Sequence, residues 1–111
     1  MITHSSRPVN FELTDHQTIP TYLRDRAKQQ PSATIFESKT PDGWVRHSAT
    51  EIHTKVLNLA ALFRRLGVSK GSVIGVMSRT RQEWSLIDLA GWYLGAIVVP
   101  VYETSVAYQA Q

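Results

Sequence analysis

The clearest hydrophobic period in the sequence lies between residues 48 and 67. Ser48 and Glu51 are spaced as in a capping box: the serine accepts from the Glu51 N–H while the glutamate reaches back to the Ser48 N–H. Gly67 follows at the place where a left-handed residue ends a helix. The pattern predicts a long amphipathic helix, because apolar residues recur at helical spacing at Ile52, Val56, Leu59, Ala60, Phe63 and Leu66.

Two smaller elements are predicted upstream. Residues 19–30 place apolar side chains near one face of a helix, with Thr18 as its N-cap and a proline after its end. Two short runs, residues 33–37 and 44–46, are rich in β-branched and aromatic side chains. They flank a Pro-Asp-Gly turn at residues 41–43, and this combination predicts a β-hairpin.

The last third of the chain changes to continuous apolar runs. Residues 73–77 and 96–102 are typical of strands buried on both faces of a parallel sheet. Between them, residues 81–94 form a helical pattern that is apolar on most sides. A second capping box, with Thr80 as the cap and Glu83 as its partner, is predicted to open that helix.

A strand, a helix and a strand joined by short connections predict a parallel βαβ unit, so the fold class is α/β. A complete α/β sheet needs more strands than these two, and Thr104 and Ser105 are typical of the cap of a further helix. We therefore expect residues 1–17 to be a flexible segment and residues 18–111 to be an incomplete α/β domain.

The amino-acid composition argues against several classes of function. The 111 residues carry a net charge of only +3 with scattered basic side chains, which does not favour nucleic-acid binding. The absence of cysteine excludes disulfides, thiolate zinc sites and cysteine nucleophiles. No secretory signal is recognisable, and the longest apolar stretch, residues 89–102, is too short for a membrane span. A cytoplasmic protein is expected, with peripheral membrane association left open.

Two segments then carry a family pattern. Residues 67–84 have the sequence Gly-Val-Ser-Lys-Gly-Ser-Val-Ile-Gly-Val-Met-Ser-Arg-Thr-Arg-Gln-Glu-Trp, and residues 95–105 have Gly-Ala-Ile-Val-Val-Pro-Val-Tyr-Glu-Thr-Ser. They resemble the early region of AMP-forming adenylating enzymes, most of all bacterial long-chain fatty acyl-CoA synthetases. The resemblance covers about residues 18–111. Ser72 stands where that family usually has aspartate, and either residue can bond backbone N–H groups in a turn.

The resemblance implies the N-terminal part of the large domain of an adenylate-forming enzyme, with the remainder of the adenylation domain as its partner. The reaction it implies is activation of a long-chain fatty acid with ATP and Mg²⁺ to an acyl-adenylate, followed by transfer of the acyl group to coenzyme A. The family's phosphate loop, acidic metal-binding motif, ribose-binding aspartate and mobile lysine have no counterpart in this sequence. No catalytic, cofactor-binding or metal residue is therefore assigned, and the 111 residues alone are expected to be inactive.

Other products and roles remain open. An acyl-AMP ligase or another acid–CoA ligase would share the pattern, and a stand-alone interaction module derived from such an enzyme belongs to a different class. The weighed candidates for ligand contact are Ser78, Arg79, Thr80 and Arg81, which follow a strand's carboxyl end; capping and solvated arginines are the simpler explanation. Plain structural roles are also favoured for His4, His16, His47, His53, Trp84, Asp88, Trp92, Tyr93 and the 102–104 segment.

Overall fold

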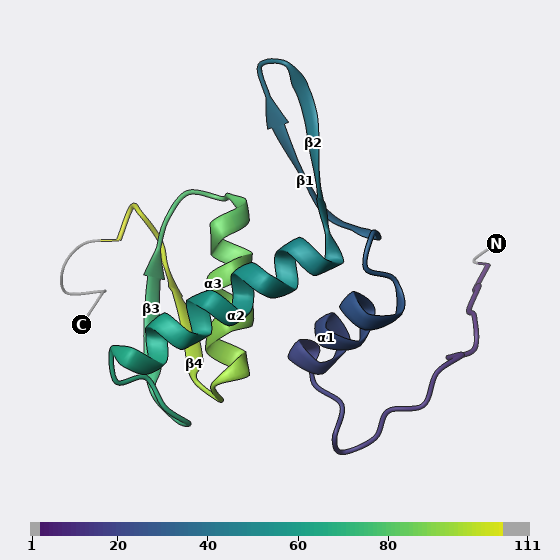
Figure 1. The fold of residues 1–111 in the computed structure, drawn as a ribbon. Helices are drawn as coiled ribbons and strands as arrows, with labels where there is room; N and C mark the ends of the chain where they lie inside the picture. The colour runs from purple at the N-terminus through teal and green to yellow at the C-terminus, as the bar shows by residue number, and fades with distance from the viewer. Residues whose placement is uncertain (1–2, 106–111) are drawn as a thin grey trace.

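The computed structural model describes residues 3–105. Residues 3–17 contain no helix or strand, and the regular elements follow in the order expected for an α/β chain. Figure 1 shows them as α1 (Ile19–Gln29), β1 (Thr34–Thr40), β2 (Gly43–Ser48), α2 (Ala49–Arg65), β3 (Val73–Met77), α3 (Gln82–Tyr93) and β4 (Ile97–Val101). The predicted mixed architecture is confirmed: an N-terminal helix, an antiparallel hairpin and a parallel strand pair around a helix.

The hairpin is longer than the sequence pattern suggested. β1 and β2 pair antiparallel, and Thr40 pairs with Gly43 next to the two-residue Pro41-Asp42 loop. Gly43 has a φ of 126°, a conformation that glycine adopts without a steric penalty. The ladder also continues past the predicted strands because polar residues such as Ser38 and His47 complete it. In Figure 1 the hairpin projects away from the helices, beginning at the start of α2.

Side-chain caps open the first two helices. Thr18 caps α1, and a reciprocal hydrogen bond from Thr21 completes a capping box. Ser48 caps α2 and accepts from the Glu51 N–H at 3.2 Å, as predicted. The second half of that predicted box is missing, because the Glu51 carboxylate instead contacts His47 and Lys55. Gly67, with a φ of 94°, lies in the left-handed conformation expected after the helix.

The predicted capping box at α3 is wrong. The N-cap is Arg81 rather than Thr80, and no side chain hydrogen-bonds the first turn. The guanidinium of Arg81 holds the Glu83 carboxylate at 2.8 and 2.9 Å, and a carboxylate engaged in this way is not available to a threonine cap. The helix consequently begins at Gln82, one residue later than expected.

The βαβ prediction is confirmed. β3 and β4 are parallel neighbours, with Val73 opposite Ile97 and Met77 opposite Val101. α3 lies against one face of this sheet and also contacts α1 and α2, so it separates the strands from the other helices. Gly91 permits the close approach: a Cβ atom built there would lie 2.7 Å from Val98 Cγ2.

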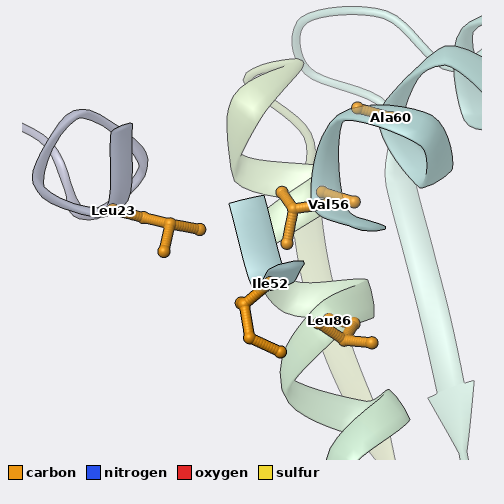
Figure 2. Packing of buried hydrophobic residues seen from close by; sticks show 6 residues of the cluster. Leu23, Ile52, Val56, Ala60 and Leu86 are labelled. Atoms are coloured by element: carbon orange, nitrogen blue, oxygen red, sulfur yellow. The ribbon is translucent and has the colours of Figure 1, made fainter. Parts of the chain in front are cut away.

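The buried core lies between the helices rather than on the sheet. Ile52 and Val56 of α2 are fully buried, and they are the largest side chains with no exposed surface. Figure 2 shows how the side chains from α1, α2 and α3 converge there. The cluster comprises Leu23, Ile52, Val56, Ala60, Leu86 and Ala90.

The expectation that both strands are buried on two faces is wrong for the residues described. Strand alternation places every second residue on the face opposite α3, and we call this set the outer face: Val73, Gly75, Met77, Ile97, Val99 and Val101. Val73 is 66% exposed, and Met77 and Ile97 are each 55% exposed. No described element lies over this face, since only α3 packs on the sheet. The further helix predicted from the cap-like Thr104 and Ser105 would fall in residues 106–111, outside the described part.

Candidate functional site

The loops that follow β3 and β4 lie at one edge of the sheet, because the carboxyl ends of parallel strands meet there. Ligands of open α/β sheets bind at this edge. The sequence candidates Ser78, Arg79 and Thr80 follow β3, and Glu103 follows β4. A salt bridge joins the two loops, with Arg79 Nε 3.7 Å from the Glu103 carboxylate. Arg79 is 89% exposed, so this pair contributes little to stability.

The other candidates in the loop have internal partners. The Ser78 hydroxyl donates to the Arg79 carbonyl at 2.9 Å. The bidentate pair with Glu83 raises the pKa of Arg81, and the same pair lowers the pKa of Glu83. Both arginines therefore face carboxylates of this chain. The simpler sequence interpretation, a Thr80 cap with solvated arginines, is correct only in that both arginines are exposed, because Thr80 does not cap α3. Tyr102 is 77% exposed beside them and has no assigned chemistry.

The four histidines lie in the N-terminal segment, in strand β2 and on helix α2. His4 and His16 are exposed in the N-terminal segment. His53 on α2 contacts the Tyr93 hydroxyl on α3 through Nε2 at 2.8 Å. Burial, assisted by Arg24 and Lys28, lowers the pKa of His53, and burial raises the pKa of Tyr93. Within residues 3–105, no three His, Asp or Glu side chains gather as a metal site would require.

The remaining sequence candidates belong to α3. Tyr93 packs against the helical core, as expected. Trp92 is 39% exposed and instead lines a shallow hollow with Ile19 and Pro20 of α1. Asp88 is half-buried, and desolvation raises the pKa of its carboxyl. None of these side chains forms a convergent ligand site.

Sequence inspection missed one polar network. Ser38 of β1, His47 of β2 and Glu51 of α2 form a continuous chain of contacts. Ser38 Oγ lies 3.0 Å from His47 Nε2, and His47 Nδ1 lies 2.9 Å from Glu51 Oε1. Gln82 of α3 adds a fourth member, with its Oε1 3.0 Å from Ser38 Oγ. Their convergence depends on the hairpin register and on the packing of α3, and neither can be derived from residue spacing.

Comparison with known proteins decides the family. The AMP-binding enzyme family matches residues 23–111. The chain belongs to this family. A long-chain-fatty-acid–CoA ligase of Mycobacterium bovis is 28% identical over 106 residues, which are 96% of this chain and 18% of that protein. The ligase named heimdall of Drosophila melanogaster, also a long-chain-fatty-acid–CoA ligase, is 26% identical over 90% of this chain and 15% of its own length.

Solved structures of other AMP-binding enzymes share the fold. A Rhodopseudomonas palustris protein described as a long-chain-fatty-acid CoA ligase superposes with a TM-score of 0.74 at 26% identity, over 85% of this chain and 23% of that chain. The fatty acid AMP ligase from Legionella pneumophila also gives a TM-score of 0.74, at 17% identity and over 83% of this chain and 16% of that one. The present chain thus spans about a fifth of the relatives it matches.

Among residues 3–105, no helix is long and apolar enough to cross a membrane.

Proposed function

We propose that this chain forms the N-terminal part of the adenylating domain of a long-chain fatty acid–CoA ligase. The observation that carries the proposal is the family match over residues 23–111, together with the shared name of the curated relatives reported above. In this reaction a fatty acid carboxylate attacks ATP to give acyl-adenylate and pyrophosphate. The thiol of coenzyme A then displaces AMP and yields the acyl-CoA.

The role of these residues is to build one part of the domain rather than to perform the chemistry. ATP, Mg²⁺ and coenzyme A would be bound mainly by groups outside the chain, because the sequence offers no phosphate loop and the described residues offer no cluster of metal ligands. Electrostatic stabilisation of a reacting phosphate requires donors and cations held in place beforehand. The two loop arginines are already paired with Glu103 and Glu83.

The outer face of the sheet supports a larger assembly. A parallel pair is normally covered by helices on both sides, and here α3 covers only one. The exposed Val73, Met77 and Ile97 would be buried against the remainder of the adenylation domain. The proposal therefore assigns to the outer face a structural contact within a complete ligase.

The test begins with the coding sequence beyond codon 111. The proposal predicts a Ser/Thr/Gly-rich phosphate loop downstream, and fatty-acid-dependent exchange of pyrophosphate into ATP by the extended polypeptide. Acyl-CoA should form when coenzyme A is added, whereas acyl-adenylate without acyl-CoA would indicate an acyl-AMP ligase instead. The 111-residue chain should show no exchange. Exchange by a homogeneous preparation of this chain alone would refute the proposed division of labour.

A further inference from the structure

The network at the base of the hairpin has the geometry of an activated hydroxyl. A serine becomes nucleophilic when a base lies within hydrogen-bond reach of its Oγ and a third group orients that base. Here the distances are 3.0 Å from Ser38 Oγ to His47 Nε2 and 2.9 Å from His47 Nδ1 to Glu51 Oε1. The three residues come from three different elements, β1, β2 and α2.

The environment of the network favours this chemistry. The His47 side chain is only 13% exposed, so its contacts are largely shielded from water. Glu51 is ionised at neutral pH, because hydrogen bonds from His47 and then Lys55 lower its pKa to about 2. An ionised carboxylate at Nδ1 fixes the imidazole tautomer with Nε2 free to accept a proton.

The orientation of the Gln82 side-chain amide supports the same chemistry. As placed, its Oε1 accepts from Ser38 Oγ, while its buried Nε2 has no hydrogen-bond partner among the described residues. A 180° rotation of the amide exchanges the two atoms. Nε2 then donates to Ser38 Oγ, and the serine proton points to His47 Nε2. This orientation gives the orphaned donor a partner and aligns the proton path from Ser38 to His47.

Ser38 also borders open space. It lines a hollow with a cavity volume of about 560 Å³ between the hairpin and the start of α3. The two carboxylates of the hollow are occupied, since Glu37 pairs with Arg46 and Glu83 with Arg81. Lys39 forms no ion pair within residues 3–105, which leaves an available positive charge beside Ser38.

We propose that Ser38 is a nucleophile that accepts an acyl group from an activated acyl compound with an anionic leaving group, with His47 as general base and Glu51 as the residue that positions His47. For an acyl phosphate, Ser38 Oγ attacks the carbonyl carbon and its proton moves to His47 Nε2. The bond between the carbonyl carbon and the phosphate oxygen breaks, and phosphate leaves with the proton from His47. An ester forms at Ser38, and no oxidation or reduction takes place.

The site is separate from the adenylating reaction. It requires neither ATP nor coenzyme A, and it uses residues of this chain alone. Its failure would therefore leave the proposed ligase function untouched, and failure of the ligase function would leave Ser38 testable.

The experiment treats the 111-residue chain with acetyl phosphate and locates acetyl groups by peptide mass spectrometry. Ser38 should be acetylated on the order of a hundredfold faster than Ser85, a serine that lines the same hollow without an imidazole partner. Ser38→Ala should abolish the modification, His47→Gln should reduce it to the level of Ser85, and Ser85→Ala should leave it unchanged. Urea should remove the difference between the two serines.

Glu51→Gln tests the positioning role of Glu51 separately from the fold. The substitution keeps the size of the side chain but removes the carboxylate that orients His47 and stabilises the imidazolium formed as Ser38 attacks. Acetylation of Ser38 should therefore slow while acetylation of Ser85 stays the same, whereas a loss of structure would change both. Far-UV circular dichroism establishes that each variant keeps its helices. Equal acetylation of Ser38 and Ser85, modification of lysines alone, or unchanged Ser38 acetylation in a folded His47→Gln variant would overturn the proposal.

Discussion

The helical core and the parallel sheet obtain their stability in different ways. Ile52 and Val56 on α2 are completely buried by contacts within the chain. On the outer face of the sheet, Val73 and Met77 are equally apolar but more than half exposed. The residue types are alike, and the difference lies in what covers them. A run of apolar residues therefore predicts that a surface is buried, but it does not predict which segment covers that surface.

The largest expected effect concerns the helical core. Ile52→Ala removes a fully buried side chain and leaves a cavity, so the free energy of unfolding should fall by about 2–5 kcal/mol. Leu57→Ala on the same helix is the control. Because Leu57 is 43% exposed, its replacement should lower the free energy of unfolding by well under half as much. Urea unfolding followed by circular dichroism measures both. Equal losses would mean that the core is not organised around Ile52.

The second prediction compares the two faces of the sheet through two glycines. An alanine Cβ at Gly91 would meet the stiff Val98 side chain at 2.7 Å, and α3 would have to move off the sheet. Gly91→Ala should therefore destabilise the chain by about 1–3 kcal/mol. At Gly75, on the outer face, the nearest atom is Val101 Cγ2 at an ordinary 3.9 Å, and Gly75→Ala should be neutral or slightly stabilising. If thermal unfolding shows no difference between the two variants, α3 does not pack as described.

The third prediction separates a true helix cap from an apparent one. Ser48→Ala removes the side chain that accepts from the Glu51 N–H, and should cost about 1 kcal/mol of unfolding free energy. Thr80→Ala should have almost no effect, because Arg81 rather than Thr80 begins α3. Denaturant midpoints compare the two directly. If Thr80→Ala lowered the free energy of unfolding as much as Ser48→Ala, Thr80 would be a helix cap after all, as the sequence suggested.

The smallest effect is a pH dependence at the start of α2. The pKa of Glu51 lies at about 2, below its usual 4.5, mainly because of the hydrogen bond with His47. A carboxyl whose pKa is lower in the folded state stabilises it fully above 4.5, and this contribution is lost as pH falls towards 2. The melting temperature should decline over that window, and Glu51→Gln should decline less. Identical declines in both proteins would show that Glu51 has no folded-state partner.

The sequence predicted the helices, strands and turns more accurately than the surroundings of individual side chains. The βαβ unit, the Ser48 cap and the left-handed Gly67 were all predicted correctly, because each depends on residues close together in the chain. The prediction of a Thr80 cap was wrong for an equally local reason: Arg81 binds the Glu83 carboxylate, and the spacing of Thr80 and Glu83 does not indicate that pairing.

The candidate site was less predictable than the fold. Ser38 and Gln82 lie 44 residues apart, and their contact depends on the hairpin register and on where α3 packs. Periodicity contains no information on either. The exposure of the outer face could not be predicted from the sequence either, because a continuous apolar run indicates burial without identifying the covering surface.

The outer face of the sheet requires a cover that residues 3–105 do not provide. Sedimentation velocity of the 111-residue chain, with hydrophobic dye fluorescence on the same samples, measures the consequence. The chain should self-associate and bind the dye, and the combined Ile97→Thr and Val99→Thr substitutions should reduce both while strand propensity is kept. A compact monomer that binds no dye would contradict the claim and would favour a stand-alone module.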